Sequence, residues 1–273
     1  MGKTLYQRIR PFIPNLPLSI SHVEPDKRLN VRLRQHLGLV TKGAVRYEPR
    51  YVRALRSLIS EGQNVVDMGA NIGFYSVLFS GWVGSTGKVI AYEPDPNNLR
   101  LLEQNVAANK CTNVSIINKA LADIAGFASF SMDSATGATG HLGVGATYGE
   151  TLFGSGREVL LNVEVSSLDR EAELWGPPDL VKMDVEGGEF DVLSGGTRTL
   201  RQHRPIVVSE LSNNESYGPG TASQAIKLLK ELDYVMWDLD SGKQVRDGQV
   251  VWTILAVPAE RASESGILSS VSG

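Results

Sequence analysis

The stretch Val65-Val66-Asp67-Met68-Gly69-Ala70-Asn71-Ile72-Gly73 decides the fold of this 273-residue chain. A short apolar run ends in a carboxylate and passes into a turn that contains two glycines, and helical spacing follows over 74–83. Glycine lets the backbone approach a ligand closely and adopt angles that other residues resist. In open α/β sheets, ligands bind where strands end and helices begin. The stretch therefore predicts a nucleoside-binding turn.

Strands and helices alternate after this turn. Apolar runs predict strands over 64–68, 88–92, 113–117, 180–183 and 206–209, and helical patterns lie over 49–59, 74–83, 96–109, 189–202 and 222–232. Such alternation favours a parallel sheet with helices on both faces. Two final apolar runs, 234–239 and 250–257, flank a turn-forming stretch without a helix, which predicts a terminal antiparallel hairpin. The fold class is α/β and Rossmann-like, with a seven-stranded, mostly parallel sheet typical of class I methyltransferases.

The remaining segments define the domain organisation. Residues 1–45 contain four prolines and no long helical pattern, so we expect an irregular N-terminal extension on the substrate side or as a lid. Residues 46–258 form the main domain, with extra strands predicted over 126–132 and 159–165. The glycine-rich loop 134–156 between them either closes over a substrate or is an insertion without a role. Residues 259–273 are expected to be a flexible tail.

Composition narrows the class of protein. The net charge of −3 argues against binding nucleic acid by neutralising phosphates. The single cysteine, Cys111, excludes an internal disulfide and suits a reducing compartment. No apolar run approaches the roughly 18 residues that a transmembrane helix needs. We therefore expect a cytoplasmic protein without a nucleic-acid partner or a transmembrane segment; the sequence does not predict an oligomeric state.

Two carboxylates indicate which nucleoside binds. Glu93 closes the second strand, where it can accept hydrogen bonds from ribose hydroxyls of either NAD or S-adenosylmethionine. Asp67 would repel a pyrophosphate but attract the cationic groups of S-adenosylmethionine. Asn71 also replaces the second glycine of the dinucleotide motif G-x-G-x-x-G. S-adenosylmethionine is favoured, with Ala120 or Leu121, after the third strand, expected to face the adenine.

Acidic residues also follow the fourth and fifth strands. Asp184, Glu186 and Glu189 come after 180–183, and Glu210 ends the fifth strand. A helix starting near Glu186 would place Glu186 and Glu189 on one face, where they could also serve only as helix caps. Asp184 could act as a general base or as a ligand of Mg²⁺ together with Glu210, although no spacing is diagnostic of a metal. His141, in the glycine-rich loop, is either a second candidate base or an exposed loop residue.

Taken together, these motifs resemble the FkbM family of methyltransferases. The matching stretches are Tyr47-Glu48-Pro49, Asp67-Met68-Gly69-Ala70-Asn71-Ile72-Gly73-Phe74-Tyr75-Ser76, Glu93-Pro94, Ser167-Leu168-Asp169 and Lys182-Met183-Asp184-Val185-Glu186-Gly187-Gly188-Glu189. The resemblance implies S-adenosylmethionine as donor and O-methylation of a small-molecule or glycan acceptor. Such acceptors are sugars in glycolipids, polysaccharides or glycosylated natural products.

The resemblance also implies which residues form the site. Cofactor contacts are expected from Asp67, Gly69, Asn71 and Glu93, with Asp184 near the transferred methyl group and Glu48 in the wall of the site. By their place in the same motifs, further cofactor candidates are Ala70, Gly73, Tyr75, Ser76 and Pro94. The rival interpretations are a methyltransferase for a non-sugar molecule, a nicotinamide-dependent oxidoreductase and a non-catalytic nucleoside-binding module. An amino-directed nucleic-acid methyltransferase is disfavoured, because an Asn/Asp-Pro-Pro-aromatic motif does not follow the fourth strand.

Overall fold

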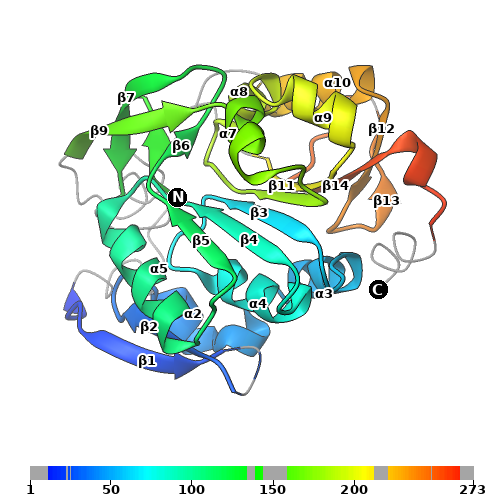
Figure 1. The fold of residues 1–273 in the computed structure, drawn as a ribbon. Helices are drawn as coiled ribbons and strands as arrows, with labels where there is room; N and C mark the ends of the chain where they lie inside the picture. Colours follow the sequence, from blue (N-terminus) through cyan, green and yellow to red (C-terminus); the bar gives the residue numbers. More distant parts are fainter. Residues whose placement is uncertain are drawn as a thin grey trace.

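The computed structural model describes residues 12–22, 24, 26–133, 139–143, 159–211, 221–246 and 248–264. Its centre is an eight-stranded sheet (Figure 1). In spatial order the strands are β13 (Lys243–Gln244), β12 (Tyr234–Asp238), β14 (Thr253–Pro258), β11 (Ile206–Glu210), β10 (Leu180–Met183), β3 (Asn64–Met68), β4 (Lys88–Tyr92) and β5 (Val114–Ile117). The expected Rossmann-like class I architecture is confirmed.

The sheet is parallel from β11 to β5, and β14 runs antiparallel between β11 and β12. The predicted terminal hairpin of β12 and β14 is therefore confirmed. The predicted count of seven strands was too low. After β12 the chain turns and adds the two-residue strand β13, which pairs with Trp237 and Asp238. Its two exposed polar residues carry none of the alternating apolar pattern by which a strand is predicted.

Helices cover both faces of the sheet (Figure 1). One face carries α3 (Pro49–Leu58), α4 (Phe74–Val83) and α5 (Pro96–Ala108), and the other carries α7 (Leu168–Trp175), α8 (Glu189–Ser194), α9 (Thr197–His203) and α10 (Thr221–Glu231). Each layer buries its own apolar cluster against the sheet, with Leu55 and Phe79 in one cluster and Leu193 and Leu229 in the other. Among the described helices, none combines the length and apolar character needed to cross a bilayer.

The single helix expected over 189–202 is in fact two helices. The chain bends at Gly195 and Gly196, between α8 and α9. A Cβ at Gly195 would lie 2.2 Å from the carbonyl oxygen of Ala122, and a Cβ at Gly196 would lie 2.6 Å from Cδ2 of Leu168. The two glycines therefore allow a close approach that a continuous helix with side chains would block.

The expectation of an irregular N-terminal segment was wrong for its described part. β1 (Pro17–Ser21) and β2 (Arg28–Arg32) form an antiparallel hairpin, and α2 (Leu37–Lys42) follows. Two asparagines of α5 hold β2 in place: Asn105 accepts a hydrogen bond from the Asn30 amide at 2.6 Å, and Asn109 accepts one from the Arg28 amide at 2.9 Å. This hairpin depends on contacts with α5, which the pattern of prolines does not reveal.

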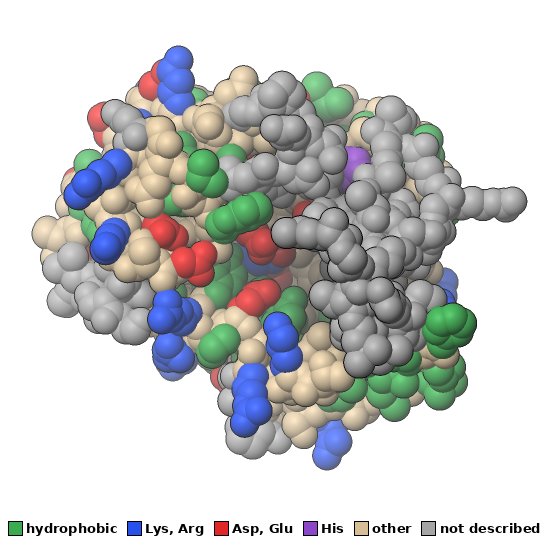
Figure 2. All heavy atoms as spheres, turned by 180° about the vertical axis from the view of Figure 1, so that it is seen from behind, with side chains coloured by type: hydrophobic (Ala, Val, Ile, Leu, Met, Phe, Trp, Pro, Cys, Tyr) green, Lys and Arg blue, Asp and Glu red, His purple; other side chains and the backbone are tan. Residues whose placement is uncertain are grey.

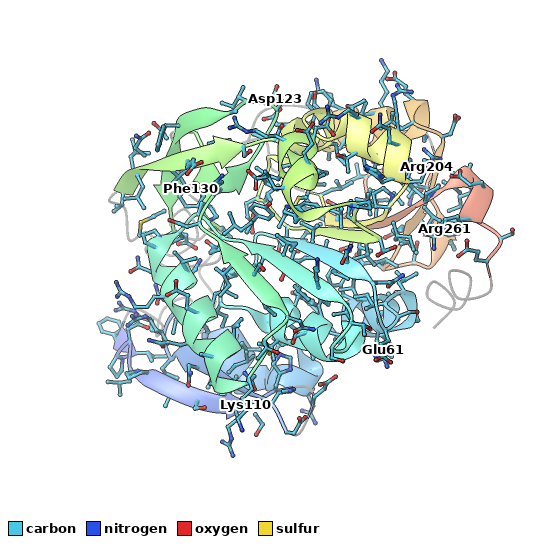
Figure 3. The ribbon with its side chains drawn as sticks, in the orientation of Figure 1. Glu61, Lys110, Asp123, Phe130, Arg204 and Arg261 are labelled. Atoms are coloured by element: carbon cyan, nitrogen blue, oxygen red, sulfur yellow. The ribbon has the colours of Figure 1, made fainter. Side chains whose placement is uncertain are left out.

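A second sheet lies beyond β5. It has the order β6 (Ala120–Leu121), β9 (Val159–Ser166), β7 (Gly126–Met132) and β8 (His141–Leu142), which confirms the two predicted extra strands. Figure 3 locates Phe130 in this sheet, beside the central one. Of the glycine-rich loop 134–156, residues 139–143 are described and include β8. The rest of that loop lies outside the described residues.

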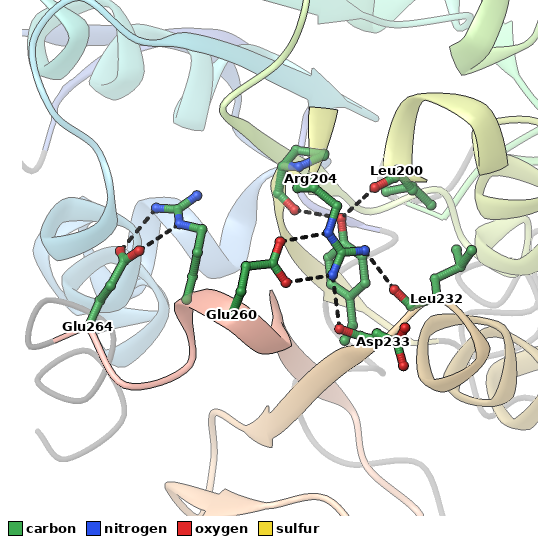
Figure 4. A network of polar contacts seen from close by, with 9 residues as sticks. Leu200, Arg204, Leu232, Asp233, Glu260 and Glu264 are labelled. Carbon is green, nitrogen blue, oxygen red and sulfur yellow. Dashed lines mark hydrogen bonds and ion pairs between the residues drawn. The ribbon is translucent and has the colours of Figure 1, made fainter. Parts of the chain in front are cut away.

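Arg204 joins three chain segments at the end of the sheet away from the predicted turn. Its guanidinium donates two hydrogen bonds of 2.9 Å to Glu260 and others to the carbonyls of Leu232 and Asp233, at 2.6 and 3.0 Å (Figure 4). It thereby ties the end of α9 to the end of α10 and to the turn after β14. Residues 259–264, which form that turn, are the described part of the segment expected to be a flexible tail. Residues 265–273 lie outside the described residues.

Candidate active site

The turn after β3 follows the backbone of β4 closely. The amides of Gly69 and Ala70 donate to the carbonyl of Tyr92, at 3.1 and 2.9 Å. Gly69 has a left-handed backbone with φ of 71°, and a Cβ on it would lie 1.8 Å from the carbonyl oxygen of Asp184. Only glycine can therefore bring this turn so near to the end of β10.

Glu93 is built into the same turn. Its carboxylate accepts hydrogen bonds from the amides of Asn71, at 2.7 Å, and Asp95, at 2.9 Å. Burial raises the pKa of Glu93 to about 8. Each carboxylate oxygen has a second lone pair, so Glu93 can still accept hydrogen bonds from ligand hydroxyls.

A pocket opens at the carboxyl ends of β3, β4 and β10. It encloses about 680 Å³ of space between protein atoms, part of which is open to solvent. Predicted site residues that line it are Gly69, Asn71, Glu93, Pro94, Ala120, Asp184 and Glu186. Leu121, the alternative to Ala120 near the adenine, also lines it. Residues that the sequence analysis did not assign to the site are Met68, Tyr92, Asn98, Lys119, Phe130, Gly140, Leu142, Val185 and Gly188. Predicted cofactor residues that do not line it are Glu48, Asp67, Ala70, Gly73, Tyr75 and Ser76.

The second sheet completes the pocket wall. Phe130 of β7 and Leu142 of β8 line the pocket next to Ala120 and Leu121 of β6. These residues come from strands that pair only through long-range contacts, so the sequence pattern carries no direct signal for them.

Asp67 lies beneath the turn, and its charge is balanced by Lys182. The Asp67 carboxylate is fully buried and sits 3.2 Å from Nζ of Lys182, while it accepts a 2.6 Å hydrogen bond from Ser76. Lys182 also donates to the carbonyl of Gly69 at 3.2 Å and lies 3.8 Å from Asp184. The sequence analysis missed Lys182, although a lysine inside the otherwise apolar strand β10 was the available signal.

The pKa of Lys182 shows which effect prevails at this buried site. Burial alone would lower the pKa, because it disfavours the charged amine. The carboxylates of Asp67 and Asp184 outweigh burial and raise the pKa of Lys182 above its usual value. Lys182 is therefore a permanent cation that two acids share.

Two further acids, Glu210 and Glu48, lie near Asp184. Register pairs Met183 of β10 with Ser209 of β11, so Asp184 and Glu210 follow side by side at the sheet edge. The Asp184 carboxylate is the main cause that raises the pKa of Glu210, to about 8. Glu48, in a left-handed conformation before α3, accepts a hydrogen bond from the Tyr75 hydroxyl, and burial raises its pKa. Asp184 and Glu210 therefore lie at one edge of the sheet, where strand ends were expected to converge, and Glu48 joins them from a separate segment.

Glu186 and Glu189 do not share a helical face, contrary to expectation. Glu186 has a left-handed backbone with φ of 53° in the loop, and α8 begins only at Glu189. Glu186 lines the pocket, where burial raises its pKa well above the usual value. Glu189 is buried and accepts a hydrogen bond from the Gly187 amide at 2.9 Å, so it braces the loop.

His141 does not line the pocket. His141 is buried in β8 opposite Ser131, and its neighbours Gly140 and Leu142, not its own side chain, line the pocket. Within the described ranges, no group of three or more histidine, cysteine, aspartate or glutamate side chains is arranged to hold a metal ion. Asp184 and Glu210 thus lack a third protein ligand among those residues.

A second depression adjoins the acids. It is lined by Glu48, Pro49, Arg50, Tyr51, Glu210, Asp240, Trp252 and Thr253. Figure 2, which views the molecule from behind, shows acidic side chains gathered in a hollow with lysine and arginine side chains around its rim. We call this depression the acidic groove. Asp184, which lines the pocket beside Glu93, follows β10 next to Glu210, which lines this groove.

Solved structures of similar fold include several methyltransferases. Methyltransferase FkbM from Methylobacillus flagellatus is 17% identical with a TM-score of 0.47, and the match covers 74% of this chain but only 47% of that one. Precorrin-6y C5,15-methyltransferase from Geobacter metallireducens is 14% identical with a TM-score of 0.46, covering 77% and 88%. An S-adenosylmethionine-dependent O-methyltransferase from Thermotoga maritima is 14% identical with a TM-score of 0.44, covering 90% and 78%.

Comparison with protein families is more specific. A search of curated proteins finds no match to this chain. The family described as "Methyltransferase FkbM domain" matches residues 67–236, which include the cofactor turn, Glu93 and the Asp184 motif. Because this match spans more than half of the 273 residues, the chain belongs to the FkbM methyltransferase family.

Proposed function

We propose that the protein is an S-adenosylmethionine-dependent O-methyltransferase that acts on a hydroxyl of a sugar, in a glycolipid, a polysaccharide or a glycosylated natural product. The observation that supports this most is the arrangement of the pocket. Glu93 and Asn71 lie at one part of its wall, apolar residues of the second sheet at another, and Asp184 and Glu186 at a third. Glu93 and Asn71 suit a ribose, the apolar residues suit a purine, and Asp184 and Glu186 suit a cationic group.

The charges of the pocket suit S-adenosylmethionine better than NAD. The only cationic side chain that lines it, among the described residues, is Lys119, which is already paired with Glu164 at 3.0 Å and Glu171 at 3.2 Å. Asp184 and Glu186 would repel a pyrophosphate and attract a sulfonium or an ammonium. When bound, S-adenosylmethionine supplies a methyl group on a sulfonium, already activated for displacement.

The chain must position the acceptor and remove a proton. Glu93 and the Asn71 turn would fix the ribose, and Lys182 would hold Asp184 in place from below. Glu210, with a pKa of about 8, is our candidate for the base that accepts the hydroxyl proton on its carboxylate. We further propose that the protein acts in the cytoplasm, since its one cysteine is buried and free.

Calorimetry tests the cofactor assignment. S-adenosylmethionine and S-adenosylhomocysteine should bind, and NAD should not. Binding of NAD without binding of S-adenosylmethionine would favour an oxidoreductase and refute the proposal. Binding without methyl transfer to any hydroxylated acceptor would instead indicate a non-catalytic module.

The transfer itself is tested with a panel of sugar acceptors. Asp184→Ala should lose at least about tenfold in kcat/KM, because it removes the acid that lines the pocket beside Glu210. Full activity in this variant would exclude Asp184 from the reaction.

A further inference from the structure

The structure points to the acceptor site. We propose that the acidic groove binds the acceptor as an uncharged, polyhydroxylated ring that stacks on Trp252 and accepts a hydrogen bond from Tyr51. This inference rests on the proposed methyl transfer, since it locates the second substrate of that reaction. It goes further by assigning residues that no motif of the sequence contains.

The groove lies where an acceptor must lie. Tyr51 and Glu48 approach it from the start of α3, and Glu210 and Thr253, which are paired in register, approach it from the sheet. Met183 pairs with Ser209 in register, so Glu210 lies beside Asp184, the acid that lines the cofactor pocket. The charge of Asp184 also adds to burial in raising the pKa of Tyr51. A ring in the groove would therefore meet the cofactor pocket at Asp184.

Trp252 offers an apolar surface in a polar groove. Its side chain is 56% exposed, whereas Trp82 in the core is 8% exposed. Ligand sites are typically lined by apolar and aromatic side chains together with a few convergent polar groups, and Trp252 lies among such groups in the groove. The electron-rich face of an indole attracts the weakly positive C–H groups of a sugar ring. Trp252 is therefore placed to bind such a ring by stacking.

Tyr51 supplies an unused hydrogen-bond donor. Its hydroxyl is buried and has no hydrogen-bond partner among the residues that the structure describes. Burial raises the pKa of Tyr51 well above its usual value, and the neighbouring acids add to this, so the hydroxyl keeps its proton. A buried donor without an acceptor is costly, and most such groups in proteins are satisfied. An oxygen atom of the acceptor ring would satisfy it.

The charges of the groove favour an uncharged acceptor. Glu48, Glu210 and Asp240 line it against one cation, Arg50, whose guanidinium already donates to the Asp240 carbonyl at 2.7 Å. The negative charges around the groove already raise the pKa values of Glu48 and Glu210, and an anionic sugar, such as a uronate, would add to that repulsion. A neutral ring can instead donate its hydroxyls to them, which carboxylates accept strongly.

Saturation-transfer NMR tests this site directly. The probes are the methyl glycosides of glucose, galactose, mannose and rhamnose, with methyl glucuronide as the anionic comparison, in the presence of S-adenosylhomocysteine. At least one neutral glycoside should bind, and the glucuronide should bind at least tenfold more weakly. Trp252→Ala and Tyr51→Phe should each weaken the neutral glycoside about tenfold. Phe127→Ala is the matched control, since Phe127 is an aromatic residue 69% exposed on β7.

Each outcome has a definite meaning. Unchanged binding in both groove variants, stronger binding of the glucuronide, or no binding of any neutral glycoside would overturn the assignment. Binding of S-adenosylhomocysteine is measured separately by calorimetry and should be unaffected by Trp252→Ala. If the wild-type protein binds glycosides but not S-adenosylhomocysteine, the proposed function fails and the groove remains a sugar site. If the cofactor binds and the groove variants behave as wild type, only this inference fails.

Discussion

Replacing Lys182 by methionine tests whether the shared cation stabilises the site. Methionine has a similar length and apolar character, so Lys182→Met fills the same space without the charge. The change leaves Asp67, which is fully buried, with the Ser76 hydroxyl as its remaining partner. We expect a large loss of stability, because an unpaired carboxylate is left inside the protein.

The magnitude follows from the burial of the two acids. Removing one partner of a buried ion pair costs about 3–5 kcal/mol. Asp184 keeps 35% of its side chain exposed, so water can solvate it after the change, and Asp67 carries most of the penalty. We therefore expect a loss near the lower end, about 3 kcal/mol. With a urea m-value of about 2–3 kcal/mol/M, the unfolding midpoint should fall by roughly 1–1.5 M.

Urea unfolding followed by circular dichroism measures this loss. Lys227→Met is the control, since Lys227 forms an exposed pair with Glu231 at 3.8 Å and should contribute less than about 0.5 kcal/mol. In the double variant Lys182→Met with Asp67→Asn, part of the stability should return, because the unpaired charge is gone. A loss below about 1 kcal/mol for Lys182→Met alone would refute the reasoning.

Four further predictions concern the cofactor, the base, a histidine and the metal. Glu93→Ala should weaken the binding of S-adenosylhomocysteine by about tenfold in calorimetry, since Glu93 can form hydrogen bonds with two ribose hydroxyls and each contributes about 0.5–1.5 kcal/mol. Unchanged affinity would remove Glu93 from the cofactor site. The kcat/KM should rise with an apparent pKa near 8, and Glu210→Gln should abolish that rise; a profile that is the same in both proteins would exclude Glu210 as the base. Burial lowers the pKa of His22 from 6.5 to about 4, so the unfolded chain binds a proton more readily and stability should fall as the pH drops from 6.5 towards 4. The loss between pH 7 and pH 5 should be about 2 kcal/mol in urea unfolding and should be absent in His22→Gln. Finally, addition of a chelator distinguishes a carboxylate base from Mg²⁺ held by Asp184 and Glu210: activity should be retained if a side chain alone removes the proton.

The sequence predicted those parts of the fold that depend on local pattern. β3, β4 and β10 have the predicted bounds because buried parallel strands are uninterrupted apolar runs. α4 also has its predicted bounds, since glycines flank an apolar segment on both sides. The division at Gly195 was missed, because its cause is contact with Ala122, far away in the chain.

The residues of the candidate site also fall into those that local sequence pattern predicts and those that only tertiary contacts place. Glu93 and Asp184 were predicted because they end strands, and strand ends of a parallel sheet converge on one edge. The position of Asp67 beneath the turn could not be predicted, since it depends on Lys182 reaching across from β10. Phe130 and Trp252 likewise line their cavities only through tertiary packing.

The crowding of acids around Asp184 has a consequence for the heat of ligand binding. The pKa values of all four acids, Asp184, Glu186, Glu48 and Glu210, are raised. Because the pKa of Glu210 is about 8, the empty site retains a proton near neutral pH. A cationic ligand favours the ionised carboxylates and should expel protons into the solution. The enthalpy observed by calorimetry should then depend on the ionisation enthalpy of the buffer, and the slope counts the protons released. This slope should be smaller in Glu210→Gln, because that variant lacks one of the groups that release a proton.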